Sequence, residues 1–224
     1  MNDVFCFDAN VFLVLPEIDP DCECCDNLFN KLENTKTTER IIEDEVRPIH
    51  EERIAILDDM LGFYETHRGS QKFPVSRMYF GTTIDFKDDI LNDIKSKDAN
   101  FIQQKLRRWM RTLILQMTTR LSKVHLPYII RTTDDVLFNT IDEIKDLDDR
   151  RHIVDVSSWV NSSPNFSLYF ITLNGEDFFL NIPSLKRKLC LHYRWDIGKC
   201  KLDILHARGV SCYKLTIFIG TIID

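Results

Sequence analysis

Glycine and proline are scarce in this chain, with seven of each among its 224 residues. That scarcity excludes a collagen-like repeat and disfavours a linker-rich architecture, while an apolar fraction of 44% is enough to build a hydrophobic core. Long apolar runs are also missing. The stretch at residues 215–223 is interrupted by polar residues and has the length of a strand, far short of the roughly 18 residues of a membrane span. We therefore predict one large domain, or a compact domain with a sizeable insertion, and no membrane segment.

Positive charge is not in excess either, because 29 Lys and Arg residues face 35 Asp and Glu residues and give a net charge of −6. This balance disfavours a protein that holds nucleic acid through overall charge, but it is compatible with a nuclease whose carboxylates bind metal ions. Residues 1–16 lack the basic start and apolar core of a secretory signal, so we expect a cytoplasmic protein. The seven cysteines are then expected to be thiols, and Cys22, Cys24 and Cys25 lack the second CxxC pair of a structural zinc site.

Two short apolar runs end in polar residues and are predicted to be buried strands. Residues 4–7 lead into Asp8, and residues 168–171 lead into Thr172. Helical spacing of apolar residues predicts helices between them, so the order of elements is typical of an α/β fold. In such folds a site forms at the carboxyl edge of the parallel sheet.

The helices are predicted from the same spacing over about residues 37–49, 85–124 and 148–160, with Pro48 marking a kink or break in the first. From residue 189 onward, apolar and polar residues partly alternate. This pattern predicts added β-strands in the tail, with a hairpin turning near Arg208 and Gly209.

Four acidic residues from separate elements could meet at the carboxyl edge of the sheet: Asp8, Glu45, Asp149 and Asp177. Clustered carboxylates raise one another's pKa, so such a group normally binds divalent cations, and oxygen ligands suit Mg²⁺ or Mn²⁺. Ions of this kind activate water for attack on a phosphodiester. A lone strand-end Asp is more often a cap or a salt-bridge partner, so order and context must decide. Asp155 lies six residues past Asp149, on a different helical face, and is a reserve candidate.

The segment VFCFDANVFL at residues 4–13 resembles the opening of PIN domains, a metal-dependent ribonuclease fold in which an apolar strand ends in Asp-x-Asn. The segments at residues 43–46, 149–156 and 170–178 resemble the later acidic elements of that family in the same order. The resemblance spans about residues 3–182 and implies a PIN-like α/β domain, a central parallel sheet flanked by helices, over residues 1–182. Residues 60–145 exceed a minimal domain and are expected to form a helical insertion, and residues 183–224 a β-rich C-terminal extension.

The resemblance also implies roles for individual residues. Asp8, Glu45, Asp149 and Asp177 would be catalytic and would bind Mg²⁺ or Mn²⁺ at a two-metal site. Substrate positioning would fall to Asn10, Thr172, Asn174 and His152. One position departs from the family, because Asn174 stands where a PIN domain usually has Asp, so the second metal site is either shifted toward Asp177 or weakened.

The function implied is metal-dependent endoribonuclease activity on RNA, single-stranded by expectation, and one setting is a toxin inhibited by an antitoxin or another protein partner. The alternative is a PIN-like module that has lost hydrolysis and serves as a binding or scaffold module. A haloacid dehalogenase-like phosphatase would need Asp at position 10, where this chain has Asn10. A homodimer stays open.

Two basic stretches are candidates for an RNA-binding surface. Cations along the helix at residues 105–123, Arg120 among them, could equally form a solvated face. Residues 186–195 mix cations with aromatic side chains, a combination that can hold single strands by charge and stacking, or can simply be a helix end with a packed aromatic.

Overall fold

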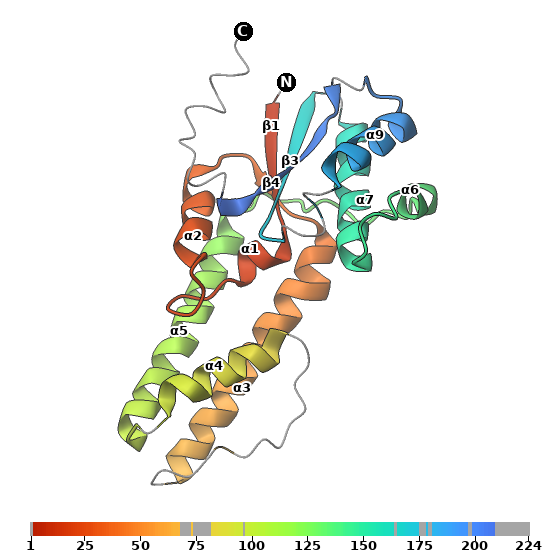
Figure 1. Ribbon diagram of the computed structural model, residues 1–224. Helices are drawn as coiled ribbons and strands as arrows, with labels where there is room; N and C mark the ends of the chain where they lie inside the picture. Colours follow the sequence, from red (N-terminus) through yellow and green to blue (C-terminus); the bar gives the residue numbers. More distant parts are fainter. Residues whose placement is uncertain are drawn as a thin grey trace.

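The computed structural model describes residues 2–67, 73, 82–95, 97–163, 165–174, 178, 181–196 and 199–208. Within them lies a four-stranded parallel sheet of order β2-β1-β3-β4, flanked by helices (Figure 1). The strands are β1 (Asn2–Phe7), β2 (Thr35–Lys36), β3 (Phe166–Thr172) and β4 (Leu202–His206). The predicted α/β fold with a central parallel sheet is confirmed.

The two strands predicted from their apolar runs, β1 and β3, are the central pair. Their register places Phe7 opposite Ile171, and the Asp8 backbone N–H donates to the Ile171 carbonyl over 2.9 Å. Because the strands are parallel, their polar ends meet at one edge of the sheet. Asp8 and Thr172 therefore lie side by side, although 164 residues separate them.

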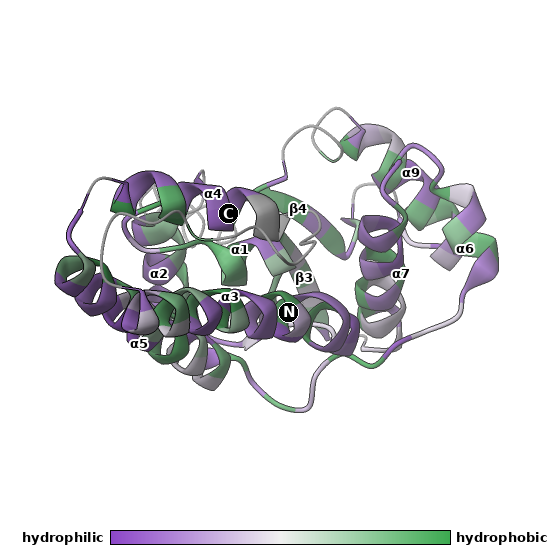
Figure 2. Cartoon of the chain, turned by 90° about the horizontal axis from the view of Figure 1, so that it is seen from below, coloured by the Kyte–Doolittle hydropathy of each residue, from purple (hydrophilic) through white to green (hydrophobic). Residues whose placement is uncertain are grey.

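Helices account for most of the remaining described chain, and hydrophilic and hydrophobic residues share their surfaces (Figure 2). None of the described helices combines the length and the apolar character that a bilayer span requires. The helical segments are α1 (Ala9–Leu13), α2 (Cys22–Lys31), the π-helix η1 (Ile41–Val46), α3 (Arg47–Thr66), α4 (Thr82–Ile94), α5 (Ala99–Lys123), α6 (Asp135–Thr140), α7 (Leu147–Ser162) and α9 (Ile182–Tyr193).

Of the kink or break predicted at Pro48, the break is wrong, because the helix continues through this residue. The Thr38 hydroxyl accepts the Ile41 N–H over 3.0 Å, as expected for a helix cap, but the helix then runs from Ile41 through η1 and α3 to Thr66. Pro48 stands in the first turn of α3, where a missing N–H is tolerated. The π-helical turn just before it supplies the local irregularity.

A second hydrophobic core lies away from the sheet, among α3, α4 and α5, which extend downward in Figure 1. The apolar stripe predicted for the long helix is confirmed on α5, where Ile102, Leu106, Trp109 and Leu113 are buried in this core. The predicted stretch is divided into two helices, and Asp98 caps the start of α5 by accepting the Phe101 N–H over 3.0 Å.

The tail differs from the expectation of a separate β-rich extension. Residues 189–193 belong to helix α9, because Leu185 and Leu189 repeat at helical spacing and are buried in the main core. The strand β4 then joins the main sheet beside β3, in parallel. Residues 209–224, with Gly209 and the apolar run at 215–223, lie outside the described residues.

Candidate metal centre

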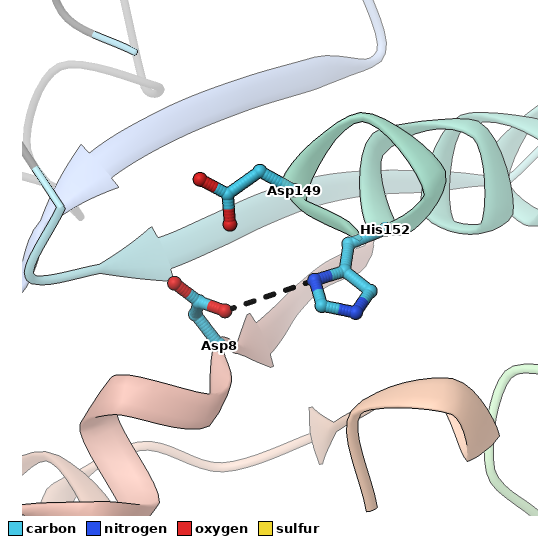
Figure 3. Close-up of side chains that lie close together, drawn as sticks. All are labelled: Asp8, Asp149 and His152. Atoms are coloured by element: carbon cyan, nitrogen blue, oxygen red, sulfur yellow. Dashed lines mark ion pairs between the residues drawn. The ribbon is translucent and has the colours of Figure 1, made fainter. Parts of the chain in front are cut away.

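Three side chains converge at the carboxyl edge of the sheet and point toward one another (Figure 3). Asp8 follows β1, while Asp149 and His152 stand one turn apart on α7. One ligand atom from each lies within 4.8 Å of the other two. A fourth side chain, Glu45 of η1, reaches the group through His152, with Glu45 Oε1 2.7 Å from His152 Nε2. Three of the four predicted acids are thus brought together, and the fourth, Asp177, lies outside the described residues.

Asp8 is held by donors on both carboxylate oxygens. Its Oδ1 accepts the Ala9 N–H over 2.7 Å, which caps α1. Its Oδ2 accepts from Asn10 Nδ2 over 2.7 Å and from the Thr172 hydroxyl over 2.6 Å. The Asn10 side chain also accepts the Leu173 N–H over 2.9 Å. Asn10 and Thr172, predicted to position substrate, therefore orient Asp8 in this structure.

Asn174 orients the second acid of the cluster, Asp149, by hydrogen bonding. Its Nδ2 donates to Asp149 Oδ2 over 2.9 Å, and its backbone N–H donates to the Thr172 hydroxyl over 2.9 Å. The residue that departs from the family pattern thus lies beside the cluster and supports Asp149 as a neutral donor.

His152 is fully buried beneath the acids. Its Nδ1 lies 3.9 Å from Asp8 Oδ1, and its Nε2 lies close to Glu45, yet neither ring nitrogen nor Glu45 Oε1 has a hydrogen-bond partner of good geometry. Buried polar atoms are normally satisfied. His152 was predicted to approach substrate; the structure places it in the floor of the group, where it offers a nitrogen ligand.

Burial and neighbouring charges shift the pKa values of the side chains in the cluster. Burial raises the pKa of Asp8, and Glu45 adds to the rise, while His152 and the Thr172 hydroxyl oppose it. Burial and then the charges of Asp8 and Asp146 raise the pKa of Asp149 to about 7. Burial disfavours the His152 cation, but Glu45, Asp8 and Asp149 outweigh it and raise the histidine's pKa above its ordinary value. Such a group is destabilised when its acids ionise and is suited to a cation.

The cluster opens into a cleft of about 320 Å³. Asp8, Asn10, Glu45 and Asp149 line its acidic end, and Asp19, whose charge acts on Arg53, also lines the cleft. Its other walls are formed largely by apolar side chains and by one cation, Arg53 of α3. The cleft therefore joins an acidic end, an apolar wall and a single positive charge, the last of which the sequence analysis did not single out.

Asp155, the reserve acid, is not part of this group. It is fully buried elsewhere on α7, where it accepts from Arg40 Nε over 3.0 Å and from the Thr132 N–H over 2.7 Å. Three residues of the predicted RNA-binding stretch at 186–195 also have partners within the fold. Lys186 pairs with Asp203 over 2.8 Å, and Tyr193 stacks on Trp195 with ring centroids 5.0 Å apart.

Any function proposed for this chain must be explained by the side chains that meet at this edge of the sheet. Its ligand atoms come from Asp8 at the end of β1 and from Asp149 and His152 on α7, and the two acids are positioned by hydrogen bonds from residues at the same edge. Comparison with protein-family models, with curated proteins and with solved structures finds no match for this chain.

Proposed function

We propose that this chain is a metal-dependent endoribonuclease of PIN-like fold that hydrolyses RNA phosphodiester bonds at the Asp8, Asp149 and His152 cluster. The observation that carries the proposal is the convergence of these three buried or half-buried groups at the carboxyl edge of a parallel sheet. The ordered resemblance of residues 3–182 to PIN domains supplies the reaction class.

The donor set fits a divalent cation. His152 Nδ1 is buried, lies 3.9 Å from Asp8 Oδ1 and lacks a hydrogen-bond partner, which is the condition expected of a ligand atom, while Nε2 lies 2.7 Å from Glu45 Oε1. Carboxylate oxygens suit Mg²⁺ and Mn²⁺, and an imidazole nitrogen favours Mn²⁺ of the two. Asp8, Asp149 and His152 would hold one ion, with Glu45 beside it, and a second ion would require Asp177.

A divalent cation bound here supplies an activated water and neutralises the charge that develops on a phosphodiester. The protein's own residues prepare the site. Asn10 and Thr172 fix the orientation of Asp8, and Asn174 fixes that of Asp149. The cleft of about 320 Å³ has the size of a small-ligand pocket, and the acids line it.

The test is cleavage of a labelled single-stranded RNA by the purified full chain in Mn²⁺, Mg²⁺ or EDTA. We expect cleavage with either ion, none in EDTA, and none from Asp149→Asn. The matched control is Asp148→Asn, because Asp148 is exposed on the same turn of α7 and its side chain pairs, among the described residues, with Arg151. Cleavage that persists in EDTA or in Asp149→Asn overturns the proposal.

The alternative, a PIN-like module that binds without cutting, is favoured by one observation. Asn174 occupies the position where the family usually has an acid, and its amide is committed to Asp149. RNA binding in Mn²⁺ without any cleavage would select this alternative. In a toxin setting, a small protein partner that covers the acidic cleft would abolish cleavage.

A further inference from the structure

Arg53 lies in the wall of the same cleft as the acidic cluster. The continuous helix formed by η1 and α3 places Glu45, Ile49 and Arg53 at intervals of four residues, and all three line the cleft. Residues four apart on a helix share a face. Arg53 is therefore presented to the cleft two turns along from Glu45.

The Arg53 side chain is a buried cation with no described carboxylate in direct contact, although the charge of Asp19, which also lines the cleft, acts on it from a greater distance. Only 7% of the residue is exposed, and no described carboxylate lies within ion-pair distance of its guanidinium. The buried Arg120 gives the contrast, because its guanidinium donates to Asp26 Oδ1 over 2.7 and 2.9 Å. Buried charges are normally paired, since taking them out of water is costly. Arg53 is an exception within the part of the chain that the structure describes.

Two contacts hold the guanidinium in place and leave donors free. Nη1 donates to the Leu13 carbonyl over 2.6 Å, and the guanidinium carbon lies 5.4 Å from the centroid of the Phe86 ring. Nε is buried and has no hydrogen-bond partner, and Nη2 donates to no described residue. An oriented guanidinium with free N–H groups suits a phosphate, whose oxygens accept from two donors at once.

We propose that Arg53 binds a phosphate group of the nucleotide in the cleft that the metal cluster also lines. The choice of phosphate as the anion rests on the proposed function. The apolar side chains of Leu13, Val14 and Leu173, which line the same cleft, face the nucleoside part of the ligand. The cleft thus recognises a nucleoside phosphate by an acidic, metal-binding end, a fixed cation and an apolar wall.

The test compares adenosine 5′-monophosphate with adenosine, each titrated calorimetrically into the full chain in Mn²⁺. We expect the parent to bind the monophosphate at least about tenfold more tightly than the nucleoside, and Arg53→Gln to lose about tenfold for the monophosphate only, as a charged hydrogen bond predicts. Arg53→Lys, which keeps the cation and a donor for Leu13, should fall between the two. The matched control is Arg47→Gln on the same helix, because Arg47 pairs with Glu43 and does not line the cleft.

Equal losses of monophosphate and nucleoside affinity in Arg53→Gln or Arg53→Lys would show a purely structural role and overturn the proposal. A parent that binds the two ligands equally would also overturn it, whatever the variants do. RNA cleavage is measured in parallel and reports on the proposed function separately. Cleavage without phosphate preference would overturn the Arg53 proposal alone, and a phosphate preference that depends on Arg53 would support it even where no RNA is cut.

Discussion

Asn174 donates a hydrogen bond from Nδ2 to Asp149 Oδ2 over 2.9 Å. The amide therefore holds a carboxylate whose pKa is already raised to about 7 by burial and by the charges of Asp8 and Asp146. A carboxylate at position 174 would replace a donor with an acceptor and bring a further negative charge to the cluster. The neutral amide is thus suited to the metal-free protein, and an acid would be suited to a bound cation.

The variant Asn174→Asp should separate the effect of an acid on the metal-free protein from its effect on metal binding. Without metal at about pH 8 we expect the free energy of unfolding to fall by about 1 to 3 kcal/mol, because Asp149 loses its hydrogen-bond donor and gains a like charge beside it. In Mn²⁺ we expect a larger rise in melting temperature than the parent shows, because the added acid is a hard ligand. Thermal unfolding with and without Mn²⁺ measures both.

Asn161→Asp is the matched control for that change. Asn161 Oδ1 accepts from Trp195 Nε1 over 3.1 Å near the end of α7, and an aspartate accepts equally well there. Its melting temperature and Mn²⁺ response should stay close to those of the parent. A stabilised metal-free Asn174→Asp, or one with the parent's Mn²⁺ response, would contradict the argument.

Asp8→Asn should lower stability and remove the Mn²⁺ response together. The Asp8 carboxylate accepts from Asn10 Nδ2 and the Thr172 hydroxyl on one oxygen and from the Ala9 N–H on the other. An asparagine turns one acceptor into a donor, so at least one buried partner is left unsatisfied, at a cost of about 1 to 3 kcal/mol. Chemical denaturation measures the first effect and Mn²⁺ calorimetry the second. Full Mn²⁺ affinity in this variant would remove Asp8 from the ligand set.

The strands and the acids at their ends were predictable because short apolar runs followed by polar residues are a local signal. That signal is strong for β1 with Asp8 and for β3 with Thr172. The helix of Asp149 was predictable from its apolar spacing. The hydrogen bonds that orient these acids, such as Asn174 to Asp149, depend on side-chain placement between distant elements, which no local pattern carries.

The burial of two arginines, Arg53 and Arg120, was not predicted from the local sequence pattern. Arg120 was expected among the cations of a long helix, yet it is fully buried and donates to the Phe12 and Val14 carbonyls over 2.6 and 2.9 Å. Its spacing of three from Met117 already places it next to the apolar stripe. Arg53 was not singled out, because the helix was predicted only over about residues 37–49. Once η1 and α3 are continuous, Glu45 and Arg53 lie on one face of one helix.

Asp155→Asn should destabilise the fold without weakening metal binding. Asp155 is fully buried and pairs with Arg40 Nε over 3.0 Å, and it also accepts from Thr132. Removing one partner of a buried ion pair costs about 3 to 5 kcal/mol. We therefore expect a large shift of the denaturation midpoint at the parent's Mn²⁺ affinity. A loss of Mn²⁺ affinity at a temperature where the variant is folded would instead assign Asp155 to the metal centre.

We expect the titration of Asp149 to contribute to the pH dependence of stability. Its pKa of about 7 in the fold lies above its ordinary value of 3.8, so between these values the folded state keeps a proton that the unfolded state has lost. The stability that this group contributes is therefore present at low pH and is lost as the pH rises to about 7. His152 acts in the same direction, because a histidine pKa raised in the fold contributes stability below its ordinary pKa and loses it as pH rises through the raised value.

Mn²⁺ competes with these protons, so its affinity should increase over the same range, by up to about tenfold per pH unit for each proton released. The measurement is the melting temperature from about pH 5 to 8 with and without Mn²⁺, for the parent, Asp149→Asn and the control Asp148→Asn. Because other acids also titrate, the difference between parent and Asp149→Asn isolates the group. Without metal, the melting temperature of the variant should rise relative to that of the parent as the pH rises. With Mn²⁺, the melting temperature of the parent should rise relative to that of the variant. A difference that is constant with pH, or an Mn²⁺ affinity that does not change between about pH 6 and 8, would mean that Asp149 titrates normally and does not bind the ion.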